Sequence, residues 1–397
     1  MLQIADNASE FSEMVVPTHT SSQQARFLHT GALQSLIDLL RRKGYDVIGP
    51  TIQQNAIVLR RIDQVEELPA GWTDNQSPAV YQITYTAEQS TADSQDASPP
   101  PRRFHFNVGP DSWKRYLFPP TASIGGASLD DDGWHFQQAE FEPPQYAFLG
   151  VRACDLAAIA IQDRVFDQGQ YVDPMYHQIR QLALIIAVNC SKSSSTCFCS
   201  SMGTGPQCTG GFDLVMTELE TGYVIEAGSE QGAAILAELP TTLASDDILR
   251  QANLQTETTA ASITKHFDAD GIRETLMGAL DHPAWQSVAE KCLSCTNCTM
   301  VCPTCFCSSV EEVSDLHETN VQRVRKWDSC FDIAMSRMSS ETARPDIRSR
   351  YRQWLTHKLA TWHDQFGTSG CTGCGRCITW CPVGIDLTES ANAIRNT

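Results

Sequence analysis

Two cysteine runs near the C-terminus decide how this chain is interpreted: Cys292-Leu-Ser-Cys-Thr-Asn-Cys-Thr-Met-Val-Cys-Pro303 and Cys371-Thr-Gly-Cys-Gly-Arg-Cys-Ile-Thr-Trp-Cys-Pro382. Both have the spacing C-x2-C-x2-C-x3-C-P. Three thiolates at this spacing can wrap one face of a cubane and anchor three of its irons, while the fourth cysteine leaves the loop and reaches the other cluster. The proline that follows has no backbone N–H and turns the chain away.

The spacing therefore predicts two [4Fe–4S] clusters whose ligands are exchanged between the runs. The predicted ligands are Cys292, Cys295, Cys298 and Cys381 for the first cluster, and Cys371, Cys374, Cys377 and Cys302 for the second. A pair of zinc sites is the alternative. Zinc usually binds two well-separated C-x2-C pairs rather than a three-cysteine run closed by C-P, so the pattern favours iron–sulfur clusters.

Composition and charge limit the partners of the chain. Its 397 residues are 42% hydrophobic and carry a formal net charge of −18, which indicates a globular protein whose acidic surface repels nucleic acid and anionic lipid. The first residues resemble no targeting segment, and no apolar run approaches the roughly 18 residues that a spanning helix needs. We therefore expect a soluble, cytoplasmic protein with no membrane insertion. In a reducing cytosol its 16 cysteines suit metal ligation better than disulfides.

The pattern along the chain predicts an α/β (or α+β) N-terminal and middle domain, followed by a mainly α-helical dicluster ferredoxin domain. The expected segments are a loosely ordered N-terminus at 1–25, the α/β domain at 26–250 with a mobile loop at 87–103 and a cysteine patch at 154–208, a linker and helical segment at 251–284, and the ferredoxin domain at 285–397. Apolar spacing at 321–338 and 347–366, between the two runs, is the reason for expecting helices there.

The cysteine patch is a candidate third metal site. Cys154 and Cys190 each follow an apolar, strand-like segment, and Cys197 and Cys199 lie together in one loop. If the two strands are parallel neighbours, their thiols meet at one sheet edge, where α/β proteins build sites. Cys154, Cys190, Cys197 and Cys199 could then hold a third [4Fe–4S] cluster. The alternative is that they are buried small hydrophobic residues, because their spacing is not diagnostic.

Several neighbouring residues have less defined roles. Asp155 could replace one thiolate of the patch, Cys208 has no assignment, and Arg376 could tune its cluster or be solvated. The sequence Thr-Cys-Phe-Cys-Ser-Ser occurs at 196–201 and again at 304–309. For the extra thiols, Cys305, Cys307 and Cys330, we favour packing beside the clusters over a further metal site. No dinucleotide-binding glycine motif or nucleophile motif is present, and no residue looks like a catalytic acid or base.

A series of motifs in one order gives the chain a family resemblance. They are Gly150-Val-Arg-Ala-Cys-Asp-Leu156, Asn189-Cys190, Cys197-Phe-Cys199, Gly211-Phe-Asp-Leu214, Cys302-Pro-Thr-Cys-Phe-Cys307, Arg325-Lys-Trp-Asp-Ser-Cys330 and the closing run from Gly373. Over roughly residues 140–390 the chain resembles the iron–sulfur beta subunit of cytosolic NiFe sulfhydrogenases. It is also similar to the iron–sulfur, electron-input subunit of anaerobic sulfite reductase, which belongs to the same family.

The resemblance implies an electron-transfer component of a multi-subunit oxidoreductase with no catalytic centre of its own. The implied partners are the small and large subunits of a NiFe hydrogenase, together with a flavin- and NAD(P)-binding subunit. The resemblance also favours the third cluster, because the family retains the cysteines at positions 154, 190, 197 and 199. The alternatives are an electron-input subunit of a sulfite reductase with that enzyme's subunits as partners, a free-standing ferredoxin-like carrier, and an enzyme acting at an open iron in the middle patch.

Overall fold

The computed structural model describes residues 25–86, 100–317 and 319–396. The expectations of a loosely ordered N-terminus and of a mobile loop fall almost entirely on residues 1–24 and 87–99, outside this part of the chain. Among the residues that the structure describes, no helix combines the length and the apolar content that crossing a bilayer requires.

The largest element is an eight-stranded mixed sheet in the order β12-β1-β11-β10-β9-β8-β2-β3. Its strands are β12 (Thr242–Leu243), β1 (Arg26–His29), β11 (Gly222–Ala227), β10 (Leu214–Glu218), β9 (Leu184–Val188), β8 (Tyr146–Val151), β2 (Asp46–Gln53) and β3 (Ala56–Arg61). The four central strands β10, β9, β8 and β2 are parallel, and the outer pairs are antiparallel. All five residues of β9 are buried, as expected for a parallel strand covered on both faces.

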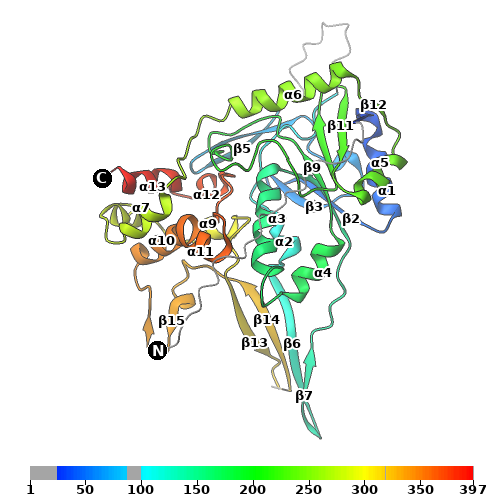
Figure 1. Cartoon of the computed structure of the whole chain (residues 1–397). Helices are drawn as coiled ribbons and strands as arrows, with labels where there is room; N and C mark the ends of the chain where they lie inside the picture. Colours follow the sequence, from blue (N-terminus) through cyan, green and yellow to red (C-terminus); the bar gives the residue numbers. More distant parts are fainter. Residues whose placement is uncertain (1–24, 87–99, 318, 397) are drawn as a thin grey trace.

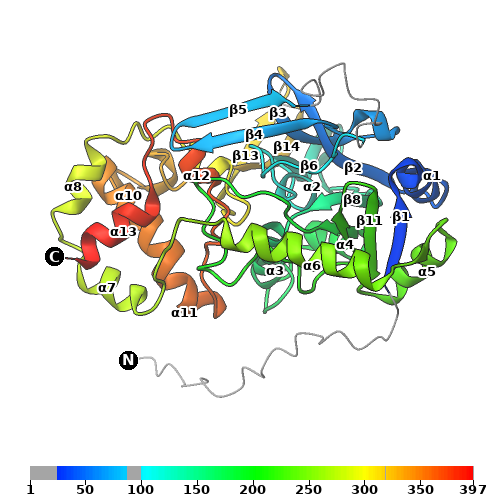
Figure 2. The ribbon, with the colours of Figure 1, turned by 90° about the horizontal axis from the view of Figure 1, so that it is seen from above.

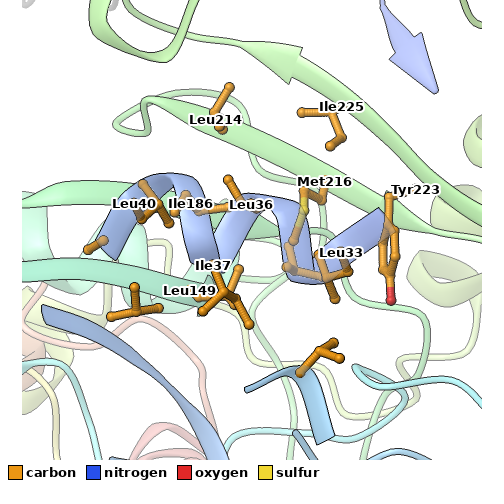
Figure 3. Close-up of a cluster of buried hydrophobic side chains, with 14 of the residues drawn as sticks. Leu33, Leu36, Ile37, Leu40, Leu149, Ile186, Leu214, Met216, Tyr223 and Ile225 are labelled. Atoms are coloured by element: carbon orange, nitrogen blue, oxygen red, sulfur yellow. The ribbon is translucent and has the colours of Figure 1, made fainter. Parts of the chain in front are cut away.

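Side chains alternate between the two faces of each strand, and here both faces carry apolar residues. Helices therefore cover both faces of this sheet. Leu149 and Ile186 pack on one face, against α1 (Leu33–Arg42) and α5 (Glu230–Glu238), as Figure 3 shows for Leu33, Leu36, Ile37 and Leu40. Their neighbours Phe148 and Ile185 point to the opposite face. That face is covered by α2 (Lys114–Leu117), α3 (Ala153–Phe166) and α4 (Pro174–Leu182). The result is an α/β sandwich of three layers.

The predicted fold class is wrong for the C-terminal region, which is not mainly α-helical. The insert between the cysteine runs contains β13 (Ser308–Ser314) and β14 (Asn320–Trp327), where helical spacing was expected at 321–338. These strands join β6 (Thr121–Asp130) and β7 (Gly133–Gln138) in a four-stranded sheet of order β13-β14-β6-β7. Figure 1 shows this sheet extending away from the main body.

A β-bulge explains why the sequence pattern suggested a helix. Val321 and Val324 are three residues apart, a spacing typical of one helix face. In β14 the register shifts between Arg323 and Val324, so the alternation of a regular strand is interrupted there. The partner strand β6 is also about two hundred residues away in sequence, and such distant pairing leaves no local signal.

The remaining C-terminal elements are mostly helical. They are α6 (Asp246–Ala261), α7 (Ile272–Gly278), α8 (Ala284–Ala289), α9 (Asn297–Met300), β15 (Arg337–Met338), β16 (Glu341–Thr342), α10 (Ile347–Thr356), a π-helical turn (His357–Thr361), α11 (Trp362–Phe366), α12 (Arg376–Thr379) and α13 (Leu387–Arg395). The helix expected over 347–366 is confirmed as α10, the π-helical turn and α11. The linker and helical segment expected at 251–284 begins within α6 and includes all of α7.

A two-stranded hairpin connects the two halves of the molecule. Its strands, β4 (Trp72–Ser77) and β5 (Val80–Tyr85), extend toward α12, as Figure 2 shows. The rings of Tyr81 and Trp380 lie 4.9 Å apart, and Thr379 Oγ1 donates a hydrogen bond of 3.0 Å to Gln76 Oε1. The hairpin therefore contacts the second cysteine run directly.

Truncation of the α1 face provides a test of this core. Leu36 is completely buried between α1 and the sheet, so Leu36→Ala should leave a cavity and lower the free energy of unfolding by about 2–5 kcal/mol. Denaturant unfolding of both proteins measures the difference. Leu254→Ala on α6 is the matched control, because that side chain is 63% exposed and should change stability little. Equal effects of the two substitutions would contradict this packing.

Candidate metal centres

The first cysteine-lined cavity lies among the C-terminal helices. Cys292, Cys295 and Cys298 from the first run line it, together with Cys381, the fourth cysteine of the second run. Phe331, Tyr351 and Trp354 form an aromatic part of the wall. The structure thus brings together the four residues that the sequence predicts as ligands of the first cluster.

The second cavity has the reciprocal composition. It is lined by Cys371, Cys374 and Cys377 from the second run and by Cys302, the fourth cysteine of the first run. Lys358 and Thr304 also line it. The fourth cysteine of each run therefore lies at the cavity of the other run, which is the arrangement that the C-x2-C-x2-C-x3-C spacing predicts.

The third cavity lies where the main sheet meets the C-terminal region. Strands β8 and β9 are parallel neighbours, so the segments that follow them, with Cys154 and Cys190, leave the sheet at the same edge. Cys197 and Cys199 complete the set of thiols from the patch. Arg152 and Lys192 line the same cavity. All four cysteines of the candidate third site therefore surround one space.

The three cavities form a continuous row. Cys377 lines both the first and the second cavity, and Cys374 lines both the second and the third. Each of these two cysteines thus lies between two adjacent cavities. The second cavity is therefore the middle of the row.

Close contact between two loops joins the second and third cavities. The backbone N–H of Phe198 donates to Gly373 O at 2.9 Å, and Thr204 Oγ1 donates to Thr372 O at 2.6 Å. A Cβ added at Gly373 would lie 2.7 Å from the Cys199 backbone, and one at Gly375 would lie 2.4 Å from Thr196 O. Both glycines also have positive φ, at 64° and 76°, so these positions require glycine for two reasons.

A buried ion pair reinforces the same junction. Arg376 NH1 and NH2 donate to the two carboxylate oxygens of Asp155 at 2.8 and 3.0 Å, and Arg376 Nε donates to Gly109 O at 3.1 Å. Both side chains are almost completely buried. Asp155 is thus engaged by Arg376 and does not line the third cavity, so its geometry does not favour the role of a replacement ligand. Arg376, in turn, is not a solvated side chain.

Burial raises the pKa of most of the thiols. Burial raises the pKa of Cys298 and Cys377 well above the usual range, that of Cys371 to about 12 and that of Cys197 to about 11. Cys302 differs, because its hydrogen bond with Cys305 and the nearby Lys358 cation lower its pKa well below the usual range. Since iron binds thiolates, ligation at the raised thiols must displace protons.

Hydrogen-bond donors around the cavities fit sulfur-rich groups. Backbone N–H groups of Ser294, Gly373 and Ile385 donate to the sulfurs of Cys292, Cys371 and Cys381 at 3.4, 3.5 and 3.3 Å. Trp354 Nε1 in the first cavity wall and Thr372 Oγ1 in the second are buried and have no hydrogen-bond partner among the described residues. Such donors need an acceptor, which cluster sulfides would provide.

The other cysteines do not line the three cavities. Cys208 packs in the core of the main sheet, and its N–H donates to Asn189 Oδ1 at 2.8 Å. Cys305 hydrogen-bonds with Cys302, and Cys307 hydrogen-bonds with Cys330. Over the described residues, no group of three or more His, Cys, Asp or Glu side chains converges on a point suited to a single ion.

Sequence reasoning missed several side chains of these sites. Lys358 lies in an otherwise ordinary helical pattern, and Arg152 precedes Cys154 with no distinguishing signal. Arg152 is buried and donates to the carbonyl oxygens of Phe104 and Phe106 at 2.6 and 3.1 Å, which fixes its position beside the third cavity. Only the fold brings these cations to the thiols.

Cysteine-lined cavities in a row, with N–H groups directed at the thiols, define an iron–sulfur protein of the electron-transfer class. Residues 291–385 match the family model of the 4Fe–4S dicluster domain. The chain is 31% identical over 256 residues to sulfhydrogenase 2 subunit beta of Pyrococcus furiosus, which covers 63% of this chain and 74% of the relative. The chain belongs to the family of sulfhydrogenase beta subunits, as its motifs suggested. No solved structure is similar enough to count as a match.

Substitution of Gly375 tests the junction between the second and third cavities. Gly375→Ala should strain the left-handed backbone and push against Thr196, so the protein should lose thermal stability and bind less iron. Calorimetry and iron analysis measure the two effects. Gly210→Ala is the matched control, because nothing lies within 4 Å of its added Cβ. Wild-type stability and iron content in Gly375→Ala would show that the loops do not pack in this way.

Proposed function

We propose that this chain relays single electrons through three [4Fe–4S] clusters arranged in a row. The observation that carries the proposal is that adjacent cavities share a cysteine wall: Cys377 between the first and second, and Cys374 between the second and third. Redox groups held in adjacent cavities of this kind suit stepwise electron transfer. The family membership and the dicluster match support [4Fe–4S] clusters as the groups that the thiols hold.

The proposed ligands follow the lining of the cavities. Cys292, Cys295, Cys298 and Cys381 hold the first cluster, Cys371, Cys374, Cys377 and Cys302 the second, and Cys154, Cys190, Cys197 and Cys199 the third. When bound, the clusters supply one-electron chemistry. The protein supplies thiolates, hydrogen bonds to sulfur and a buried surrounding. The N–H groups that already point at Cys292, Cys371 and Cys381 support this division of roles.

We further propose that the chain works within a hydrogenase-type complex. The relative is named as a subunit of a sulfhydrogenase, which supports an assembly of several subunits. The proposed partners are the small and large subunits of a NiFe hydrogenase, together with a flavin- and NAD(P)-binding subunit. Affinity purification of the native protein from its source cells, with identification of every partner, tests this assignment. Recovery of sulfite reductase subunits instead would replace the hydrogenase assignment.

Iron counting tests the number of clusters. Anaerobically purified protein should contain about twelve irons, and Cys190→Ser combined with Cys199→Ser should lower this to about eight, since both thiols line only the third cavity. Elemental analysis and the visible charge-transfer absorption measure the loss. Cys208→Ala is the matched control, because this buried thiol lines none of the three cavities and should leave about twelve irons. Eight irons in the wild type would remove the third cluster from the proposal.

The isolated chain should carry electrons without turning over substrates. We expect no hydrogenase, sulfite-reducing or NAD(P)H-oxidising activity, but reduction by a low-potential chemical reductant. The sequence has no phosphate-cradling glycine loop, and conversion between single electrons and a hydride needs a flavin. Spectrophotometric assays with and without the partner subunits make the comparison. If this chain alone reduced a viologen dye with NADPH as the electron donor, the proposal that it only relays electrons would be wrong.

A further inference from the structure

The middle cavity contains a buried ammonium group. Lys358 is only 2% exposed, and its Nζ donates to Cys302 Sγ at 3.3 Å, Thr304 Oγ1 at 3.1 Å and Gly370 O at 3.0 Å. These three acceptors match the three N–H bonds of a protonated amine. No carboxylate is among them. A full positive charge is thus hydrogen-bonded to the thiol sulfur of Cys302, a proposed ligand of the second cluster.

The helix that carries Lys358 holds this group firmly in place. Lys358 lies in the π-helical turn between α10 and α11, and its Nζ lies 5.5 Å from the centre of the Trp362 ring. The N–H of Gly370 donates to Lys358 O at 2.8 Å, so the backbone of the lysine is also tied to the segment before Cys371. π-helical turns often occur at functional sites, where they redirect one side chain.

The first cavity has a different electrostatic character. Its lining consists of cysteines, aromatic and aliphatic residues and small polar residues, and none of the described lining side chains is charged. Arg350 does not line this cavity, although its positive charge interacts electrostatically with Cys292. Its NH1 donates to the carbonyl oxygens of Arg344 and Pro345 and not to a cysteine sulfur. The two cavities are built from equivalent cysteine runs, but among the described residues only the second has a cation hydrogen-bonded to the sulfur of a proposed ligand.

Other cations near the middle cavity do not duplicate this role. The charge of Arg376 is neutralised by its two hydrogen bonds with Asp155. Lys114 is also buried, but its Nζ donates to the backbone carbonyl of Cys305 at 3.0 Å and not to the sulfur of a proposed ligand. Lys358 is therefore the cation placed to act directly on the second cluster.

We propose that Lys358 makes the second cluster more easily reduced than the first, so that an electron shared between these two clusters favours the second. This inference rests on the ligand sets of the proposed function. One-electron reduction adds one negative charge, and a cation in contact with a ligand sulfur stabilises that charge. The interaction is strong because burial excludes water and screening salt. Reduction at the first cavity receives no equivalent stabilisation.

Redox titration of the full-length, anaerobically purified protein, followed by electron paramagnetic resonance, tests the proposal. Cys295→Ser changes a thiol that lines only the first cavity, and Cys190→Ser changes one that lines only the third, so the two variants identify the signals of those clusters and the remaining signal belongs to the second. The wild type should show the second cluster reduced at the more positive potential. Lys358→Met should move that midpoint to a more negative potential and leave the midpoint of the first cluster unchanged. Lys358→Arg, which keeps the charge, should restore most of the wild-type value.

Two controls separate a charge effect from a loss of structure. Lys291→Met removes the same charge beside Cys292, but at an exposed position, and should change neither midpoint by a comparable amount. Iron content shows whether each variant keeps its clusters. An unchanged second midpoint in Lys358→Met, or equal shifts in the Met and Arg variants, would overturn the proposal.

The wild-type order of potentials provides a test that needs no variant at position 358. A first cluster that is reduced before the second would also overturn the proposal, even if Lys358→Met failed to fold. Absence of iron from the wild-type protein would instead refute the proposed function. The two failures are therefore distinguishable.

Discussion

The contact between two loop backbones is the constraint on which the arrangement of the sites depends. The loop with Thr196 and Cys199 belongs to the α/β part of the chain, and Gly373 and Gly375 belong to the second cysteine run. Because neither glycine has a side chain, the backbones approach closely enough for Phe198 N–H to donate to Gly373 O at 2.9 Å. This contact places the third cavity beside the second, with only Cys374 shared between them. Without it, the third cysteine-lined cavity would be separate from the other two, and there would be no continuous row.

Charge in the interior is arranged to suit buried thiolates. Isolated buried charges are costly, so each buried cation near the cavities has partners: Arg376 has Asp155, and Lys358 has Cys302, Thr304 and Gly370. Burial meanwhile raises the pKa of Cys298 and Cys377, so binding of iron by these proposed ligands would displace their protons. The cations would therefore favour the proposed ligand sets, which become negative when they bind metal. They also distinguish cavities whose cysteine spacing is the same.

The two halves of the molecule are held together by more than the loop contact. Strand β14 from the insert pairs with β6 from the first half, and the β4–β5 hairpin contacts the second cysteine run through Tyr81 and Trp380. These connections explain why a region that contains two ferredoxin-type runs is not an independent helical domain. Part of its backbone hydrogen bonding is satisfied by β6, a strand from the first half of the chain.

The sequence by itself determined the chemistry of the two C-terminal sites, because three cysteines at intervals of three residues impose a local geometry on the backbone. It also determined the central strands, whose apolar runs such as Leu184–Val188 must be buried on both faces. Only the tertiary structure decided the rest. The pairing of β14 with β6, the meeting of Cys154 and Cys190 with the loop of Cys199, and the position of Lys358 at Cys302 all join residues distant in sequence. Local spacing carries no information about such contacts, since they form only when separate elements pack together.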